Sequence, residues 1–256
     1  MNINVAKTGL TEILFLRELF LQENNFQIRY NACHERGWSD SYIISIDNIA
    51  IGYGSVKGKE SLTARDTVFE FYIIPSFRKM SPVVFPALLS ISGAAFIECQ
   101  SNDFLLSAML YEFSQNICSE VVLFADYRVT DIDFPGIVFR QRKNDDIIFE
   151  HKGEPEGEYV LEKDAEVIAT GGFMLHYNMP FSDLYMEVNE KFRRKGYGTY
   201  LIQELKKASY CKGRVPAARC NIGNKASKAT LIKAGLEPCG YMLSGAVKPL
   251  QQLSNK

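Results

Sequence analysis

A turn at residues 193–199 combines the residue types that bind a phosphate group. It holds three cations, two glycines and two hydroxyl side chains: Arg193, Arg194, Lys195, Gly196, Tyr197, Gly198 and Thr199. The turn leads into a helical pattern that places Leu201, Leu205 and Ala208 on one face. Backbone N–H groups at such a helix start have no partner within the helix, and glycine removes side chains that would block a ligand. We therefore predict that this turn binds a phosphate or pyrophosphate.

The turn differs from the two familiar nucleotide-binding loops. The sequence has no G-x-x-x-x-G-K-[ST] pattern, which argues against a Walker-type NTPase. Leu201 stands where a dinucleotide-binding fingerprint needs its third glycine. What remains is an R-x-x-G-x-G pattern after a strand-like run, and by itself this pattern fits a solvated turn as well as a binding loop.

The turn and the segments around it resemble the pyrophosphate loop of the GNAT superfamily, the acetyl-CoA-dependent N-acyltransferases. Strand-like stretches at 158–163, 167–177 and 182–188 precede the loop, and another lies at 216–222. The resemblance implies that the strand before the loop splays from its neighbour. Free backbone groups at Met186 and Val188 would then pair with the pantetheine arm of acetyl-CoA.

A second part of the resemblance begins at Asn224. In the family, an Asn opens a helix, a small residue follows three positions later, and a Gly after the helix precedes a large apolar residue. Ser227, Gly235 and Leu236 fit that pattern here. Asn and Gly are also ordinary helix caps, so each has a local explanation. Together with the loop, Asn224 and Ser227 complete the expected acetyl-CoA-binding residues.

The first half of the chain reads as a weaker copy of the second. The stretches 71–78 and 186–193 each place a β-branched residue five positions before an Arg and a Phe one position before it. We expect a mixed α/β fold with two GNAT-like domains, each a mostly antiparallel twisted sheet with flanking helices. The boundaries are 1–136 for a degenerate domain and 137–256 for the acetyl-CoA-binding domain.

The loop of the first copy lacks the features that bind a phosphate. Ser81 and Val83 replace the two glycines, and Pro82 between them has no N–H to donate. Only the second half is therefore expected to bind acetyl-CoA, and the first half is interpreted as a scaffold or a wall on the substrate side.

The general base and acid are the weakest part of the resemblance. Family members often place a carboxylate or histidine at positions that match Ser182 and Leu184, and neither residue can act as an effective base. The family's Tyr that protonates the leaving thiolate matches Leu231.

Two carboxylates, Asp183 and Glu187, lie on the strand before the loop, and Glu187 is nearer to it. Glu187 is the candidate catalytic base, although alternation along a strand turns both carboxylates away from the face of Met186. An exposed Glu has a pKa of about 4.3, so this role requires a desolvated setting that raises the pKa. His176 and a chain of water molecules are the alternatives.

Composition limits the range of functions. At 256 residues two domains are favoured over one, and a net charge of −1 argues against a general nucleic-acid binder. The six cysteines show neither a C-x-x-C pair nor zinc-finger spacing, so no metal site is expected. The apolar runs are too short to cross a bilayer, and no leader pattern opens the chain, so we expect a cytoplasmic protein without a membrane partner.

The resemblance implies an enzyme that moves an acetyl group from acetyl-CoA to a primary amine on a small molecule or peptide. Two other readings stay open. One is a non-catalytic module that binds or senses CoA, and the other is an aminoacyl-tRNA-dependent transferase. The R-x-x-G-x-G loop argues against the second, because such enzymes have no pyrophosphate to place there. The sequence determines neither the acceptor amine nor the oligomeric state.

Overall fold

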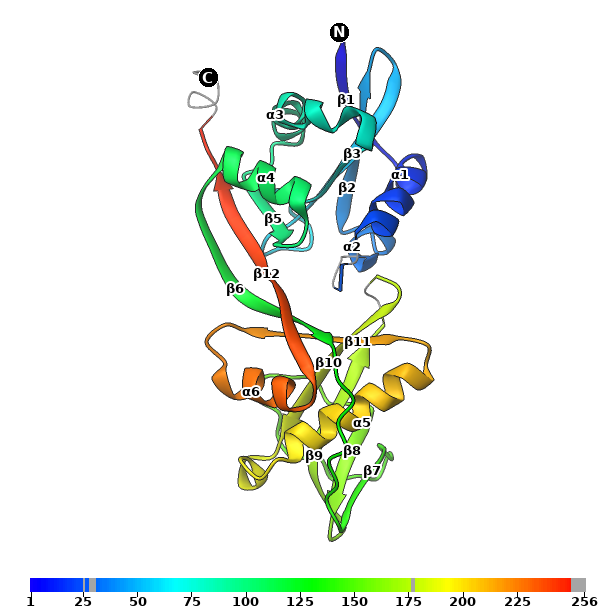
Figure 1. Cartoon of the computed structure of the whole chain (residues 1–256), viewed down its shortest axis with the longest axis vertical. Coiled ribbons are helices and arrows are strands. Elements are labelled where there is room, and N and C mark those ends of the chain that lie inside the picture. Colours follow the sequence, from blue (N-terminus) through cyan, green and yellow to red (C-terminus); the bar gives the residue numbers. More distant parts are fainter. Residues whose placement is uncertain (25, 28–30, 176–177, 250–256) are drawn as a thin grey trace. The chain divides into compact units, whose positions relative to one another are not determined.

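The computed structural model describes residues 1–24, 26–27, 31–175 and 178–249, which form two units (Figure 1). Apart from a few residues around position 27, the second unit is Val121–Cys239. The first unit contains the preceding chain and resumes at Gly240. The division therefore differs from the expected boundary after residue 136. The two differ because the units are divided within two strands, β6 (Ser114–Asp126) and β12 (Leu236–Val247), each of which contributes residues to both units.

The first unit has the order β-α-α-β-β-β-α-β-α before β6. Its strands are hydrogen-bonded in the order β1-β2-β3-β4-β5-β12, all antiparallel except the parallel pair β4–β5. The elements are β1 (Ile3–Thr8), α1 (Leu10–Glu23), α2 (Asn31–Glu35), β2 (Ser39–Ile46), β3 (Ile49–Lys57), β4 (Thr67–Ile73), the 3-10 helix η1 (Pro75–Met80), α3 (Ser81–Ser92), β5 (Phe96–Gln100) and α4 (Phe104–Phe113).

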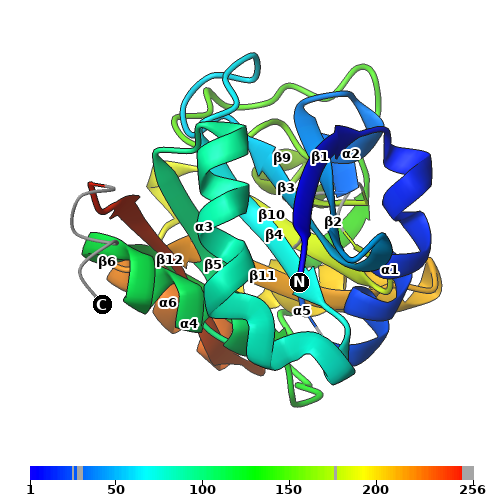
Figure 2. The ribbon, with the colours of Figure 1, turned by 90° about the horizontal axis from the view of Figure 1, so that it is seen from above.

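Helices cover both faces of this sheet. Helix α1 packs Ile13 and Phe20 against Tyr53 and Tyr72 on one face. Helices α3 and α4 form a larger apolar core on the other face, and Figure 2 shows α1 and α3 on opposite sides of the strands. Because each face is covered, the strands read as largely apolar, with every residue of β4 buried.

The second unit repeats the later part of this order. Its strands are hydrogen-bonded in the order β6-β11-β10-β9-β8-β7, with β10–β11 the parallel pair. The elements are β7 (Ile137–Gln141), β8 (Tyr159–Lys163), β9 (Glu166–Met174), β10 (Phe181–Val188), the 3-10 helix η2 (Glu190–Phe192), α5 (Tyr197–Cys211), β11 (Val215–Asn221) and α6 (Lys225–Lys233). The mixed α/β fold with mostly antiparallel strands and flanking helices is confirmed.

Helix α5 positions the turn at its start by burying one face against the sheet. Leu201 and Leu205 are fully buried, and they pack with Ile168 and Leu184 of the sheet. Truncating a buried leucine to alanine costs about 2–5 kcal/mol, so this contact fixes the helix firmly. The predicted apolar face of the helix is confirmed.

The two units share a glycine at the same place in the fold. Gly54 of β3 pairs with Phe71 of β4, and Gly171 of β9 pairs with Met186 of β10. A Cβ on Gly54 would lie 2.3 Å from a Leu88 methyl of α3, and one on Gly171 would lie 2.9 Å from a Leu205 methyl of α5. Each glycine lets a helix approach its strand closely. This physical equivalence supports an internal repeat.

Candidate functional site

Strands β10 and β11 separate at the point where the chain approaches the predicted loop. Their parallel pairing runs from Phe181 with Val215 to Leu184 with Ala218, whereas β10 continues to Val188. The N–H of Asn189 bonds to Ile168 of β9, so alternation directs the N–H groups of Met186 and Val188 away from β9, toward the gap. The strand edge that the resemblance implied is therefore present.

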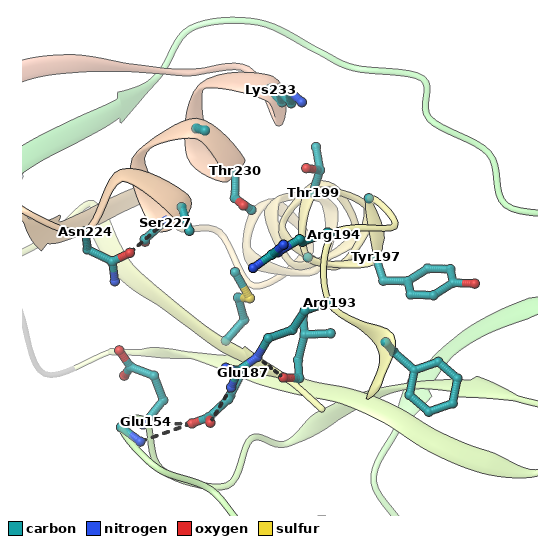
Figure 3. A pocket seen from close by; sticks show the side chains of 18 residues that line it. Glu154, Glu187, Arg193, Arg194, Tyr197, Thr199, Asn224, Ser227, Thr230 and Lys233 are labelled. Atoms are coloured by element: carbon teal, nitrogen blue, oxygen red, sulfur yellow. Dashed lines mark hydrogen bonds and ion pairs between the residues drawn. The ribbon is translucent and has the colours of Figure 1, made fainter. Parts of the chain in front are cut away.

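A cavity of about 670 Å³ lies at this gap (Figure 3). It contains ten of the eleven residues predicted to bind acetyl-CoA: Met186, Val188, Arg193, Arg194, Gly196, Tyr197, Gly198, Thr199, Asn224 and Ser227. The eleventh, Lys195, lies outside the lining, and its ammonium is near the Phe192 ring. Residues that sequence reasoning missed complete the wall: Gly153, Glu154, Phe192, Ala226, Ala229, Thr230 and Lys233.

Two glycines shape the turn before α5. Gly196 is the N-cap residue with φ of +90°, a conformation that strains other residues, and no side chain caps the helix start. A Cβ on Gly198 would lie 3.2 Å from the Met186 methyl and 3.4 Å from Thr230 Cγ2. The free N–H groups of the first turn and the absence of these side chains leave a cradle suited to an anion.

Arg193 links the turn to β10. Its Nε donates to the carbonyl oxygen of Val188 at 2.9 Å, and its Nη2 lies 3.4 Å from Glu187 Oε1. The side chain remains nearly half exposed. Arg193 and Arg194 both line the cavity, and Lys233 adds a third cation from α6. This charge complements a phosphate at the helix start.

Asn224 has a local role in the structure. Its Oδ1 accepts the N–H of Ser227 at 3.0 Å, which makes it the N-cap of α6. Because both residues also line the cavity, the cap sets where α6 begins relative to the cavity. Leu231, which stands where the family has its Tyr, is a buried residue of the apolar core.

Glu187 lies in a setting opposite to the one that a general base requires. Burial by itself favours the protonated carboxyl, but N–H groups of Glu154, Lys152 and Gly153 donate to the carboxylate at 3.1–3.2 Å. These bonds hold the pKa of Glu187 below its ordinary value. The hypothesis that Glu187 is the general base required a raised pKa, and the pKa of Glu187 is instead lowered.

Asp183 has the properties that Glu187 lacks. Only 4% of the residue is exposed, and burial raises its pKa to about 6, although Arg219 partly opposes this effect. Arg219 Nε lies 3.1 Å from Asp183 Oδ2, while Oδ1 has no hydrogen-bond partner among the described residues. Asp183 pairs with Ala217, one residue before the last β10–β11 pair. A buried carboxylate thus lies one residue before the two strands separate, and it is not among the residues that line the cavity.

His176, the alternative base considered from the sequence, lies outside the described residues. Cys220 is a buried thiol on β11, and burial raises its pKa, which disfavours the reactive thiolate. Within the described residues, no helix has the length and apolar character needed to cross a membrane.

Comparison with known proteins agrees with this geometry. Residues 124–235 match the Acetyltransferase (GNAT) family, a range that includes the splayed strands, the turn and α6. The chain contains a GNAT acetyltransferase domain. Among curated proteins, none matches this sequence.

Several solved structures have the same fold as this chain over almost its whole length, although their sequence identity with it is low. A GNAT-family acetyltransferase from Colwellia psychrerythraea is 13% identical with a TM-score of 0.76, covering 97% of this chain and all of its own. A GCN5-related N-acetyltransferase from Sphaerobacter thermophilus is 12% identical with a TM-score of 0.61, covering 96% of both chains.

A tandem GNAT protein from the clavulanic acid biosynthesis pathway, solved without acetyl-CoA, has a TM-score of 0.62 and 9% identity. It covers 97% of this chain and 99% of its own. The two-unit layout therefore occurs in a protein with two GNAT domains in one chain. At these identities the likeness concerns the fold.

The first unit has a smaller cavity, between α1, β4 and the start of α4. It measures about 230 Å³ and is lined by Phe20, Asn24, Phe71, Tyr72, Arg78, Asp103, Phe104 and Leu105. Arg78, which the sequence comparison aligned with Arg193, forms an ion pair with Glu23 of α1. Pro82 lies at the start of α3, where it removes a donor.

Proposed function

We propose that the second unit transfers an acetyl group from acetyl-CoA to a primary amine. The observation that carries this proposal is one cavity that joins an anion-binding helix start and a strand edge, with the buried carboxylate of Asp183 on the same strand but outside the cavity lining. Acyl transfer requires these three features, because the donor must be held, its carbonyl polarised and the amine deprotonated.

The residues of the cavity fit acetyl-CoA. The pyrophosphate would lie at the first turn of α5, where Gly196 and Gly198 leave room and Arg193 and Arg194 supply charge. The pantetheine arm would follow the free edge of β10. A backbone N–H of Val188 or Met186 would then point at the thioester carbonyl and stabilise the negative charge that develops on its oxygen.

Asp183 is the proposed general base. With a pKa of about 6 it is ionised at neutral pH. Its Oδ1 has no hydrogen-bond partner among the described residues but is buried, so a proton from the amine would have to reach it through water. Arg219 holds the other oxygen and so fixes the orientation of the carboxylate. The raised pKa makes Asp183 a stronger base than an exposed Asp, whose pKa is about 3.9.

The first half is proposed to be a degenerate copy that does not bind acetyl-CoA. Its cavity is smaller, its Arg78 is paired with Glu23, and its loop has Pro82 in place of a donor. Val68 occupies the position that corresponds to Asp183, since each pairs with a residue of the parallel strand near the end of the shared ladder. This half therefore also lacks the proposed base.

The test is incubation of the full chain with acetyl-CoA and a panel of amines while free thiol is measured. Release of thiol that requires both the amine and Asp183 supports the proposal. The second candidate, a silent CoA-binding module, is favoured by Leu231 in place of the family's Tyr. It predicts that CoA binds in calorimetry but that no amine releases thiol.

A further inference from the structure

The segment 151–157, here termed the strap, has neither helix nor strand and is attached to the sheet of the second unit. Glu187 of β10 fastens its start. The consecutive N–H groups of residues 152–154 donate to the Glu187 carboxylate at 3.1–3.2 Å. Figure 3 shows Glu154 beside Glu187 at the cavity, with the bond between them. Three backbone donors on one carboxylate form a directional anchor.

Thr170 of β9 holds the strap at two further points. Its Oγ1 lies 3.0 Å from His151 Nε2 and accepts the N–H of Gly157 at 3.4 Å. His151 Nδ1 lies 2.9 Å from the carbonyl oxygen of Glu154, and a carbonyl oxygen only accepts. Nδ1 therefore carries the proton, and Nε2 accepts from the threonine hydroxyl. At the end of the strap, a Cβ on Gly157 would overlap the carbonyl oxygen of Gly171, so the strap lies directly on the backbone of β9.

The first unit fastens a covering segment from the same position of the repeat. Tyr72 and Glu187 each come directly after the residue that pairs with the shared glycine. The Tyr72 hydroxyl donates to Glu23 of α1, the helix that covers that face of the first sheet. In the second unit, Glu187 binds the strap instead. This strand position thus anchors a covering segment in both units.

The strap lies on the side of β10 from which an acceptor must approach. Leu184 and Met186 pack with the residues of α5, so alternation turns Asp183 and Glu187 to the opposite face. The donor phosphate is proposed to lie at the start of α5, which leaves that opposite face to the amine, together with the proposed base. Residues 153–154 of the strap line the cavity there.

We propose that the strap is the wall against which the acceptor amine binds, and that Glu187 is a positioning residue that holds this wall in place. This inference rests on the proposed acetyl transfer. Glu187 then acts on the acceptor through the peptide groups of residues 152–154 and does not take a proton. An ionised carboxylate suits this task because both of its oxygens accept and neither donates. Glutamine at this position would offer only one accepting oxygen.

Limited proteolysis with trypsin measures the fastening of the strap without any turnover. The Lys152 side chain is 62% exposed, but its N–H is bound to Glu187, so cleavage after Lys152 requires the strap to open. Glu187→Gln should speed this cleavage about 10- to 100-fold, the scale of losing a hydrogen bond to a charged group. The matched control is Glu190→Gln. Glu190 pairs with Lys152 and Arg193 only through exposed side chains, so cleavage should change less than about twofold.

The kinetic test loosens the strap at two different points and uses the amine of the panel with the highest kcat/KM. Glu187→Gln and Thr170→Val should each raise KM for that amine about 10-fold, while kcat and CoA affinity change less than about threefold. Thr170 does not line the cavity, and valine keeps nearly its shape without the hydroxyl that bonds to His151 and Gly157. An effect of Thr170→Val on KM must therefore pass through the strap. A general-base role for Glu187 would instead lower kcat.

Two results would overturn this inference while leaving acetyl transfer intact. One is equal trypsin cleavage after Lys152 in the wild type and in Glu187→Gln. The other is an amine KM that both variants leave unchanged, with circular dichroism showing that they are folded. A wild-type chain that releases no thiol with any amine would instead count against acetyl transfer itself, and the trypsin assay would still show whether Glu187 fastens the strap.

Discussion

Asp183 and Glu187 show how neighbours decide the chemistry of identical groups. Both are carboxylates on the same face of β10, four positions apart, and both are largely buried. Glu187 receives backbone N–H groups that stabilise its ionised form, whereas Asp183 has Arg219 on one oxygen and nothing described on the other. Their pKa values therefore move in opposite directions from the ordinary ones.

Replacing Asp183 tests the assignment of the base. Asp183→Asn should lower kcat about 10²- to 10⁴-fold with little change in CoA affinity, because the amide cannot accept the proton. In the wild type, kcat/KM should fall as the pH drops through about 6, since Asp183 is protonated below that value. The facing charges are Arg219 and Glu154. A variant that keeps this acidic limb would show that another group titrates.

The sequence favoured Glu187, and the structure favours Asp183, for a physical reason. Proximity to the loop favoured Glu187, but its N–H donors lie 33 to 35 positions away in a segment with no periodic pattern. Nothing local reveals them. The spare oxygen of Asp183 depends in the same way on Arg219, which arrives from β11. Residue types were readable, but their electrostatic environments required the tertiary structure.

At the scale of elements, sequence reasoning succeeded where the signal is local. Alternating and periodic apolar residues located β8, β10, β11 and α5 within a few residues, and the caps of α6 marked its start. For the predicted strand at 167–177 the structure has β9 at Glu166–Met174, and residues 176–177 lie outside the described residues. The turn before α5 could be predicted because its conformation depends on backbone groups and glycines rather than on distant partners.

Gly198→Val tests the helix start as the site of the pyrophosphate. The added side chain would begin 3.2 Å from the Met186 methyl and extend into the cradle, so CoA affinity should fall at least about 100-fold. Arg193→Ala should weaken binding less, by about 10-fold, because it removes one partly exposed charge. Calorimetry gives both values, and circular dichroism checks the fold. Unchanged affinity in Gly198→Val would place the ligand elsewhere.

At the scale of the whole molecule, the predicted internal repeat raises the question of how many acetyl-CoA molecules one chain binds. Titration of the full chain with CoA should give one site, because the first unit offers about 230 Å³ against about 670 Å³ in the second. In the first unit Arg78 also forms an ion pair with Glu23, which already neutralises its charge. A stoichiometry of two would show that the first copy keeps a working site. Repeating the titration with Gly198→Val would then reveal that site alone.

A fragment that ends at the expected boundary, residue 136, tests whether the first domain folds without the strands that the two units share. The N-terminal fragment 1–136 lacks β12, whose residues Met242–Ala246 pair with β5. We expect it to lose cooperative thermal unfolding and to associate through the exposed edge of β5. A synthetic peptide spanning 236–249 should restore a monomer. Cooperative unfolding of the fragment at the temperature of the intact chain would contradict this. Such long-range pairing leaves no mark in local sequence patterns.

The late position of β12 also affects how the chain is made. Met242 pairs with Gln100, 142 positions earlier (242 − 100), so the edge of β5 leaves the ribosome long before its partner exists. At about 5–20 residues per second, the unpaired edge would wait for about 7–28 s. During translation this protein thus carries an open strand edge that the finished molecule does not have, and chaperones would meet it in that interval.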